Sequence, residues 1–146
     1  MGPRRSRRES SSDDPRQRLG SDGERAAERV LREAGLSIVE RRFRLKIGEI
    51  DLIASDGPLV VFVEVKTRRG SSHGLPAQAV TPRKRATIAR VAAAYLVRRG
   101  LSERPCRFDV VQVFAGRRGV ERVDHIRDAF RLWDDDRSTR FTRRLG

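Results

Sequence analysis

The spacing of apolar and polar residues along the chain predicts two helices and a set of strands. Apolar residues recur at helical intervals over 20–35, which predicts a first amphipathic helix. Thr81 and Pro82 form the start signal of a second helix, whose apolar stripe ends near Arg98. Apolar-rich segments with the character of strands occupy 37–45, 48–54, 59–65 and 106–115.

The order of these segments predicts the fold class. Two strands separated by a helix favour parallel pairing, so the segments 59–65 and 106–115 are expected side by side. A segment at 119–123 predicts an edge strand, and a short amphipathic C-terminal helix is predicted from Ile126, Ala129, Phe130 and Trp133. We therefore expect an α/β fold in the order α-β-β-β-α-β, with a mixed β-sheet and helices on both faces.

The two ends of the chain differ in composition from its centre. Residues 1–18 are rich in Arg, Ser, Asp and Pro and offer little to bury, which predicts a disordered basic arm. Residues 134–146 form a polar tail. The folded domain is accordingly expected over 19–133.

Charged residues enter the most apolar part of the chain. The segment 59–65 is apolar on both alternating sides, as in a strand that is covered on both faces. Glu64 and Lys66 nevertheless fall on the same side as Phe62. A charge at such a place loses hydration, which is costly unless a partner compensates it. The pair is therefore either tied up with partners or placed for chemistry.

The turn at 55–58 sets which residues share a side of the hairpin. With Ala54 opposite Leu59, Asp51 falls opposite Phe62, and opposed residues of an antiparallel pair point the same way. Three carboxylates and one ammonium are then expected to converge on one side: Glu49, Asp51, Glu64 and Lys66. Ordinary cross-strand salt bridging on a solvated face is the alternative.

Other polar residues carry weaker signals. Glu24 lies on the flank of the apolar stripe of the first helix and can lean toward the sheet, although the helix dipole alone favours an acid there. His73 has no second ligand at metal spacing, and Asp109 and His125 are interpreted as structural. Candidate phosphate contacts near the glycine-rich loop and the second helix start are Arg68, Arg69, Gln78, Arg83 and Lys84.

Composition narrows the class of partner and the compartment. The chain of 146 residues has a net charge of +13, carried almost entirely by arginine, which attracts polyanions and makes nucleic acid the expected partner. A single cysteine, Cys106, excludes an intramolecular disulfide and suits a reducing compartment. No run approaches the roughly 20 apolar residues of a membrane span. We expect a cytoplasmic protein.

The order of the acids and the lysine resembles a known nuclease pattern. Glu24 on the first helix, Asp51, and the Glu-x-Lys of Glu64 and Lys66 are arranged as in the PD-(D/E)XK nuclease superfamily. More closely, the chain resembles the YraN-like family of uncharacterised bacterial proteins, which is similar to archaeal Holliday junction resolvases. The resemblance runs from about Gly20 to Trp133 and rests on 23–24, 48–54, 60–68, 79–84, 107–111 and 125–130.

This resemblance implies a restriction-endonuclease-like core and a metal site. Asp51 and Glu64 would bind Mg²⁺ or Mn²⁺, with the carbonyl of Val65 as a third oxygen ligand and Glu24 completing the site from the first helix. Lys66 would orient the attacking water and balance the charge that builds on the phosphate. The proline that leads the superfamily motif is replaced by Ile50, a loosely kept position.

The function implied is hydrolysis of a phosphodiester in DNA, with branched or damaged DNA as the substrate by analogy with resolvases. Cleavage of two strands in that manner would require a homodimer. One alternative is a nucleic-acid-binding or assembly module that keeps the nuclease fold without turnover. Another is a protein-interaction domain in which the carboxylates form a structural ion-pair network. Nothing in the sequence separates DNA from RNA.

Overall fold

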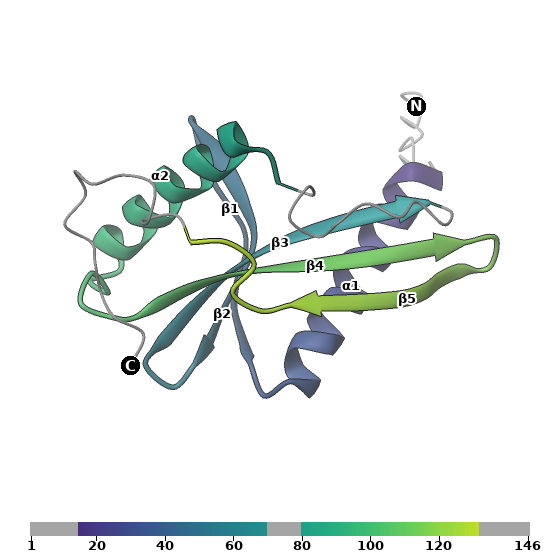
Figure 1. The fold of residues 1–146 in the computed structure, drawn as a ribbon, viewed down its shortest axis with the longest axis horizontal. Coiled ribbons are helices and arrows are strands. Elements are labelled where there is room, and N and C mark those ends of the chain that lie inside the picture. Colours follow the sequence, from purple (N-terminus) through teal and green to yellow (C-terminus); the bar gives the residue numbers. More distant parts are fainter. Residues whose placement is uncertain (1–14, 70–79, 132–146) are drawn as a thin grey trace, which may run out of the picture.

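One mixed sheet with a helix on each side makes up the part of the chain that the computed structural model describes, residues 15–69 and 80–131 (Figure 1). The strand order of this described part is β1-β2-β3-β4-β5, in which β3 and β4 pair in parallel and the other neighbours are antiparallel. The elements are α1 (Pro15–Glu33), β1 (Ser37–Leu45), β2 (Gly48–Asp56), β3 (Leu59–Arg69), α2 (Pro82–Arg98), β4 (Cys106–Gly116) and β5 (Gly119–Ile126). The predicted α/β class and the parallel pairing are confirmed.

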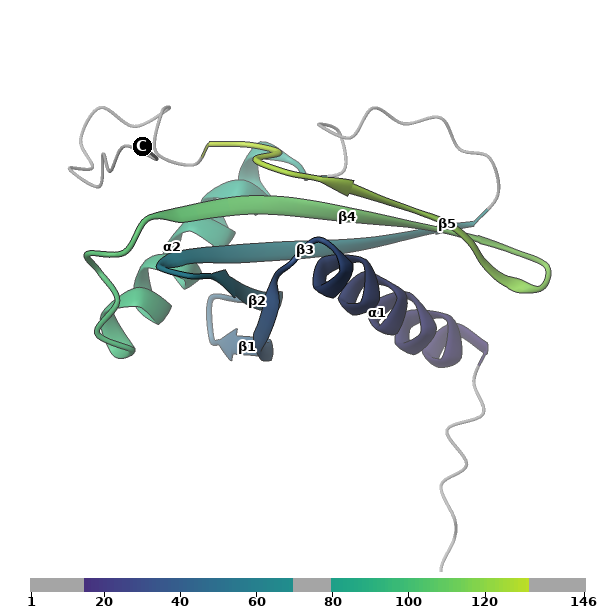
Figure 2. The ribbon, with the colours of Figure 1, turned by 90° about the horizontal axis from the view of Figure 1, so that it is seen from below.

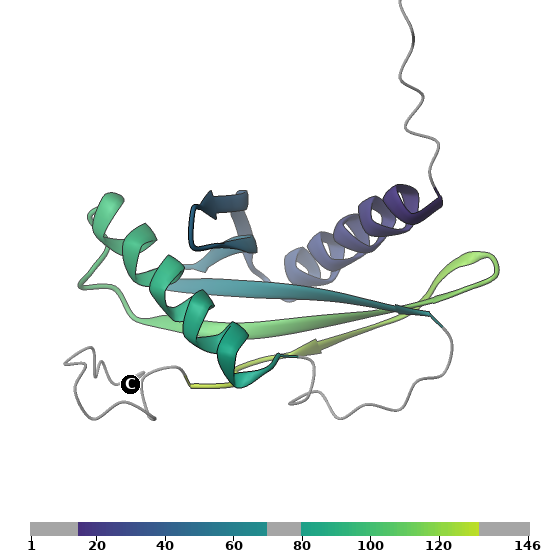
Figure 3. The same cartoon turned by 90° about the horizontal axis from the view of Figure 1, so that it is seen from above.

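The two helices cover opposite faces of the sheet, as Figures 2 and 3 show. On the α2 face, Phe62 and Phe108 pack with Ile88, Val91 and Tyr95 of the helix. On the α1 face, the buried residues are Ala27, Leu31, Leu36, Leu52, Ala54, Val61, Val63, Val111 and Val113. Alternate residues of β3 therefore enter different cores, which explains why its sequence is apolar on both sides.

Helix α2 begins and ends where its sequence predicts. The side chain of Thr81 accepts a hydrogen bond from the backbone N–H of Lys84, 3.2 Å away, and Pro82 is the first helical residue. The helix ends at Arg98, and Gly100 follows with a φ of +66°. Within the described residues, neither helix combines the length and apolar character needed to cross a bilayer.

Helix α1 begins at Pro15 and not near Gly20. Pro15 to Arg18, which the sequence places in the basic arm, are thus helical: proline suits the first helical position, and Arg and Gln are good helix formers. The rest of the predicted arm, 1–14, lies outside the described residues.

A close approach joins α1 to β3. A Cβ atom on Gly23 would lie 2.6 Å from Oγ1 of Thr67, closer than any side chain tolerates. Glycine at this position lets the helix backbone lie directly against the strand. The approach places Glu24, the next residue, close to the sheet.

The β2–β3 turn is tighter than predicted. Asp56 pairs with Leu59 and Ala54 with Val61, so the turn consists of Gly57 and Pro58 alone, with a φ of +55° at Gly57. The predicted pairing of Ala54 with Leu59 is wrong by two residues. Because this shift is even, it does not by itself move any side chain to the other face.

The C-terminal part of the described chain extends the sheet. Strand β5 runs to Ile126, further than the predicted edge strand at 119–123. The predicted helix does not form over 126–131, because the backbone there bonds to β4: the N–H of Ala129 donates to the carbonyl of Phe108, 2.8 Å away. Asp128, with a φ of +50°, turns the chain. Trp133 and the polar tail lie outside the described residues.

Candidate functional site

Strands β2 and β3 stop pairing one residue before the two central acids. The ladder ends at Leu52 and Val63, so Asp51 and Glu64 are the next positions on the two strands. The Oδ2 atom of Asp51 accepts a hydrogen bond from the backbone N–H of Val65 at 2.8 Å. A side chain thus bonds a strand amide where the ladder ends, and this bond fixes the Asp51 carboxylate beside β3.

The alternation of β2 is interrupted at Asp51. Ile50 and Ile53 both belong to the α2 core although they are an odd number of residues apart. A Cβ on Gly48 would also meet Thr87 of α2. On the neighbouring strand β1, Arg41 pairs with Leu52 and Phe43 with Ile50. Arg42 between them therefore lies beside Asp51, and it has a φ of +51°. Such a backbone is costly for arginine and is found where surrounding structure imposes it.

This irregularity separates Glu49 from the other acids. Gly48 and Ile50 face α2, so Glu49 between them points away, and it forms an ion pair with Arg44 on β1 at 2.7 Å. The prediction that Glu49 shares a side with Asp51 and Glu64 is therefore wrong. That prediction assumed that side chains alternate regularly between the two faces along β2, and this alternation is broken at Asp51. Glu49 shows the cross-strand salt bridging expected of a surface pair.

Asp51 and Glu64 interact strongly with each other. Burial and the negative charge of Glu64 raise the pKa of Asp51 to about 7. Glu64 itself is only 7% exposed. Two carboxylates this close in a poorly solvated place repel each other when both are ionised, and a bound cation would relieve that repulsion.

The lysine that contacts Glu64 comes from α2. The Nζ atom of Lys84 forms an ion pair with Oε1 of Glu64. Lys66, two residues along β3 from Glu64, is exposed and forms no ion pair with any residue of 15–69 or 80–131. The structure thus brings Lys84, predicted as a phosphate contact, onto the acid of the Glu-x-Lys motif.

Glu24 is held by arginine. Both of its carboxylate oxygens accept hydrogen bonds from Nη2 of Arg42, at 3.0 and 2.8 Å. Arg42 in turn lies in the field of Asp51 and Glu49, which raise its pKa further after the larger effect of Glu24. Within the described residues, no group of three or more acidic, histidine or cysteine side chains is placed to hold a metal. Asp51 and Glu64 interact directly with each other, whereas the carboxylate of Glu24 is bonded to Arg42.

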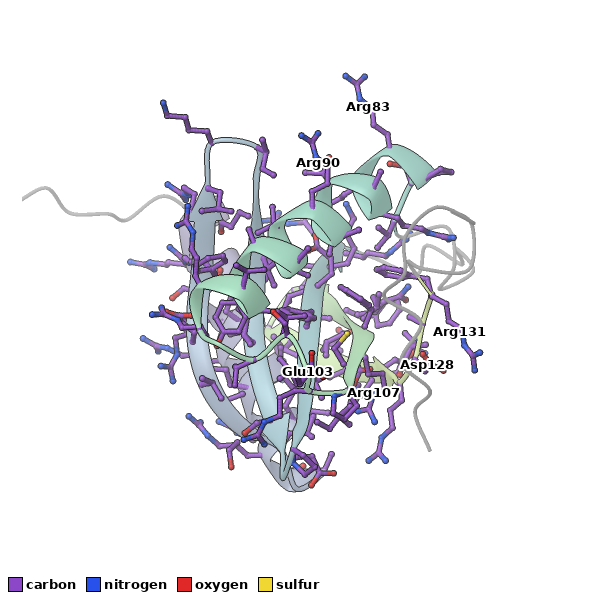
Figure 4. The ribbon with its side chains drawn as sticks, turned by 90° about the vertical axis from the view of Figure 1, so that its left-hand side faces the viewer. Arg83, Arg90, Glu103, Arg107, Asp128 and Arg131 are labelled. Carbon is purple, nitrogen blue, oxygen red and sulfur yellow. The ribbon has the colours of Figure 1, made fainter. Side chains whose placement is uncertain are left out.

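The remaining predicted contacts are spread over the surface near this site. Arg68 is partly buried at the end of β3, and Arg69 is exposed. Arg83 is exposed and stands out from the start of α2, away from the sheet (Figure 4). Gln78 lies outside the described residues. The metal-binding role of the Val65 carbonyl stays a prediction.

A buried glutamine beside Lys66 was missed by the sequence reasoning. Gln112 of β4 pairs in register with Lys66 and is 2% exposed, and its Nε2 has no hydrogen-bond partner among residues 15–69 and 80–131. A polar residue within the apolar run 106–115 is the signal that could have identified it. Its free N–H groups suit an oxygen acceptor.

Asp109, the second polar residue of that run, is fully satisfied. It accepts hydrogen bonds from Nε and Nη2 of Arg107 at 2.7 and 2.8 Å and from the N–H of Asp128 at 3.0 Å, and it lies 2.8 Å from Nε2 of His125. Arg107 and Asp128 lie on the same side of the molecule in Figure 4. The cluster ties β4 to the end of β5, in agreement with a structural role.

Comparison with known proteins identifies the family. The model of the uncharacterised protein family UPF0102 matches residues 23–113. The UPF0102 protein of Symbiobacterium thermophilum is 50% identical over 77% of this chain and 96% of its own length. Those of Geotalea uraniireducens and Rhodococcus jostii are 46% and 47% identical, over 78% and 77% of this chain and 90% and 95% of their own lengths. The match spans both central acids, and the chain belongs to the UPF0102, or YraN-like, family.

Proposed function

We propose that this protein is a metal-dependent nuclease that hydrolyses a phosphodiester bond in DNA. The observation that carries the proposal is the pairing of Asp51 with Glu64: two adjacent, poorly solvated carboxylates, one of which has a pKa raised to about 7 by burial and by the other. Such a pair gains from a bound divalent cation. Carboxylates whose pKa is shifted by burial and by a neighbouring charge cluster at functional sites.

The donor set fits Mg²⁺ or Mn²⁺. Both ions prefer carboxylate and water oxygens, and Asp51 and Glu64 supply two carboxylates, with the Val65 carbonyl as the third proposed ligand. Glu24 can become a metal ligand only if its carboxylate leaves Arg42, because both of its oxygens accept hydrogen bonds from that guanidinium. A bound divalent ion would lower the pKa of a water molecule and stabilise negative charge on the phosphate.

The other residues have roles that follow from where they lie. The N–H of Val65 occupies Oδ2 of Asp51 and so orients the carboxylate. Lys66 is exposed two residues beyond Glu64, where its ammonium can reach a phosphate oxygen and balance the charge of the transition state. The net charge of +13 favours association with a polyanion.

A non-catalytic nucleic-acid-binding module is the second candidate, and a specific observation favours it. Glu24 is paired with Arg42 and Glu64 with Lys84, so the protein neutralises these acids without a metal. A site of this kind could have kept the nuclease fold and the basic surface while losing turnover.

A cleavage assay separates the two candidates. Purified protein is incubated with duplex, single-stranded, flapped and four-way DNA, with Mg²⁺, Mn²⁺ or chelator. The nuclease is expected to yield product only with metal, and Asp51→Asn and Lys66→Ala to abolish product while DNA binding persists. Asp124→Asn, which changes a half-exposed acid on β5, is the matched control and should cleave normally. Product that survives both chelator and Asp51→Asn would exclude this site, and salt-sensitive binding without product would favour the binding module.

A further inference from the structure

Lys84 lies at the start of α2 with its ammonium on Glu64. The Thr81 cap fixes the first turn of the helix by accepting the N–H of Lys84. The side chain of Lys84 is 45% exposed, whereas that of Glu64 is 7% exposed. The pair therefore joins a buried acid to a cation that keeps a path to solvent.

The charges around Glu64 make this pair necessary when no metal is bound. A buried carboxylate without a counter-charge is strongly unfavourable. Asp51 adds a second acid next to Glu64, and the charge of Lys84 acts on Asp51 as well, lowering the pKa that burial and Glu64 raise. Lys84 thus pairs with Glu64 and acts electrostatically on Asp51 as well. Its ammonium compensates the negative charge of Glu64, as a bound divalent ion would.

We propose that Lys84 and a divalent cation compete for Glu64. Lys84 compensates the acid in the metal-free protein and leaves it when the metal binds. Lys84 is thus a positioning residue of the site, distinct from Lys66, which faces solvent. The competition deepens the proposed function, because it rests on metal binding by Asp51 and Glu64.

Mn²⁺ binding to the full-length protein tests the competition. Free Mn²⁺ is measured by electron paramagnetic resonance for the wild type, Lys84→Met and Arg83→Met. Lys84→Met removes the competing ammonium and should bind Mn²⁺ roughly fivefold more tightly or better, as expected for loss of a nearby like charge and of the ion pair. Arg83→Met removes the same charge from the same helix turn without touching Glu64, and should change the affinity by less than about twofold.

Thermal unfolding gives a second readout: the rise in melting temperature that Mn²⁺ causes, which a merely structural ion pair would leave equal in the two proteins. In chelator, Lys84→Met should melt below the wild type because Glu64 loses its counter-charge. Saturating Mn²⁺ should then raise the melting temperature of Lys84→Met by more than it raises that of the wild type. In the Glu64→Gln background, Lys84→Met should have little effect with or without Mn²⁺.

The outcomes separate this inference from the proposed function. If the wild type binds Mn²⁺ and Lys84→Met binds it no more tightly, the competition is wrong and the metal site stands. If neither protein binds Mn²⁺, the metal site is wrong and the competition with it. Weaker binding by Lys84→Met would make Lys84 a support of the metal site, which also contradicts the competition.

Discussion

The carboxylate of Asp51 accepts a hydrogen bond from the backbone N–H of Val65, the residue that follows Glu64 on the neighbouring strand. This bond holds Asp51 beside Glu64 at the point where the two strands stop pairing. It lowers the pKa of Asp51, yet burial and the charge of Glu64 outweigh it. The protein therefore keeps two acids together at an electrostatic cost.

That cost predicts a dependence of stability on pH in the absence of metal. The pKa of Asp51 is raised from 3.8 to about 7 on folding, so the folded state binds the proton more tightly than the unfolded chain. The contribution of Asp51 to the free energy of unfolding is then fully present at low pH, below the unfolded-state pKa, and is lost as pH rises through the folded-state pKa. Between about pH 5 and pH 8 the loss should be at most about 3 kcal/mol in urea unfolding with chelator.

Asp51→Asn is the control for this titration. The variant keeps both histidines, so its pH dependence reports the other groups, and the wild-type loss should exceed it over the same range. Asp109 does not interfere, because its pKa is lowered and its effect on stability falls in more acidic solution. Identical profiles for the two proteins would contradict the raised pKa of Asp51.

The close approach of Gly23 to Thr67 predicts that the effect of Gly23→Ala on the free energy of unfolding changes sign when Thr67 is shortened. Gly23→Ala should destabilise the wild type by about 1 to 3 kcal/mol, because the new Cβ meets Oγ1 of Thr67. In a Thr67→Ala background the same change should stabilise by up to about 1 kcal/mol, since alanine is the better helix former. Urea unfolding of the four proteins measures both effects. A cost that persists without the Thr67 hydroxyl would show that another contact requires this glycine.

The buried cluster around Asp109 predicts a large loss of stability. Asp109→Asn leaves Arg107 and His125, 17% and 8% exposed, without their anion, and should cost about 3 to 5 kcal/mol. Asp124→Asn breaks a largely solvated pair with Arg122 on the neighbouring edge strand β5 and should cost less than about 1 kcal/mol. Equal losses in urea unfolding would mean that the Asp109 bonds contribute little.

The elements themselves could be predicted because their signals are local. The cap at Thr81 and Pro82, the helical stripe through Tyr95 and the two-sided apolar run of β3 each lie within a few residues. The parallel pairing of β3 with β4 followed from the helix between them. The acids of the motif were also identified from this apolar setting and from the family resemblance.

The site could be predicted only in part, because its geometry depends on long-range packing. Nothing in the sequence marks the positive φ of Arg42, which accompanies the interruption of β2 and the removal of Glu49 from the shared side. The position of α2 on the sheet decides which lysine reaches Glu64. The lysine that does so is Lys84 of α2, and not Lys66 of the Glu-x-Lys motif. The partner of Glu24 is likewise a residue of another element.

A crystal structure of the protein soaked in Mn²⁺ tests the central claim most directly. The anomalous signal of manganese locates the ion without reference to activity. The account predicts a peak between the carboxylates of Asp51 and Glu64, with the Lys84 ammonium displaced from Oε1 of Glu64, and no such peak in Asp51→Asn. A fully soaked crystal with no peak at these acids, and with Lys84 still on Glu64, would contradict it.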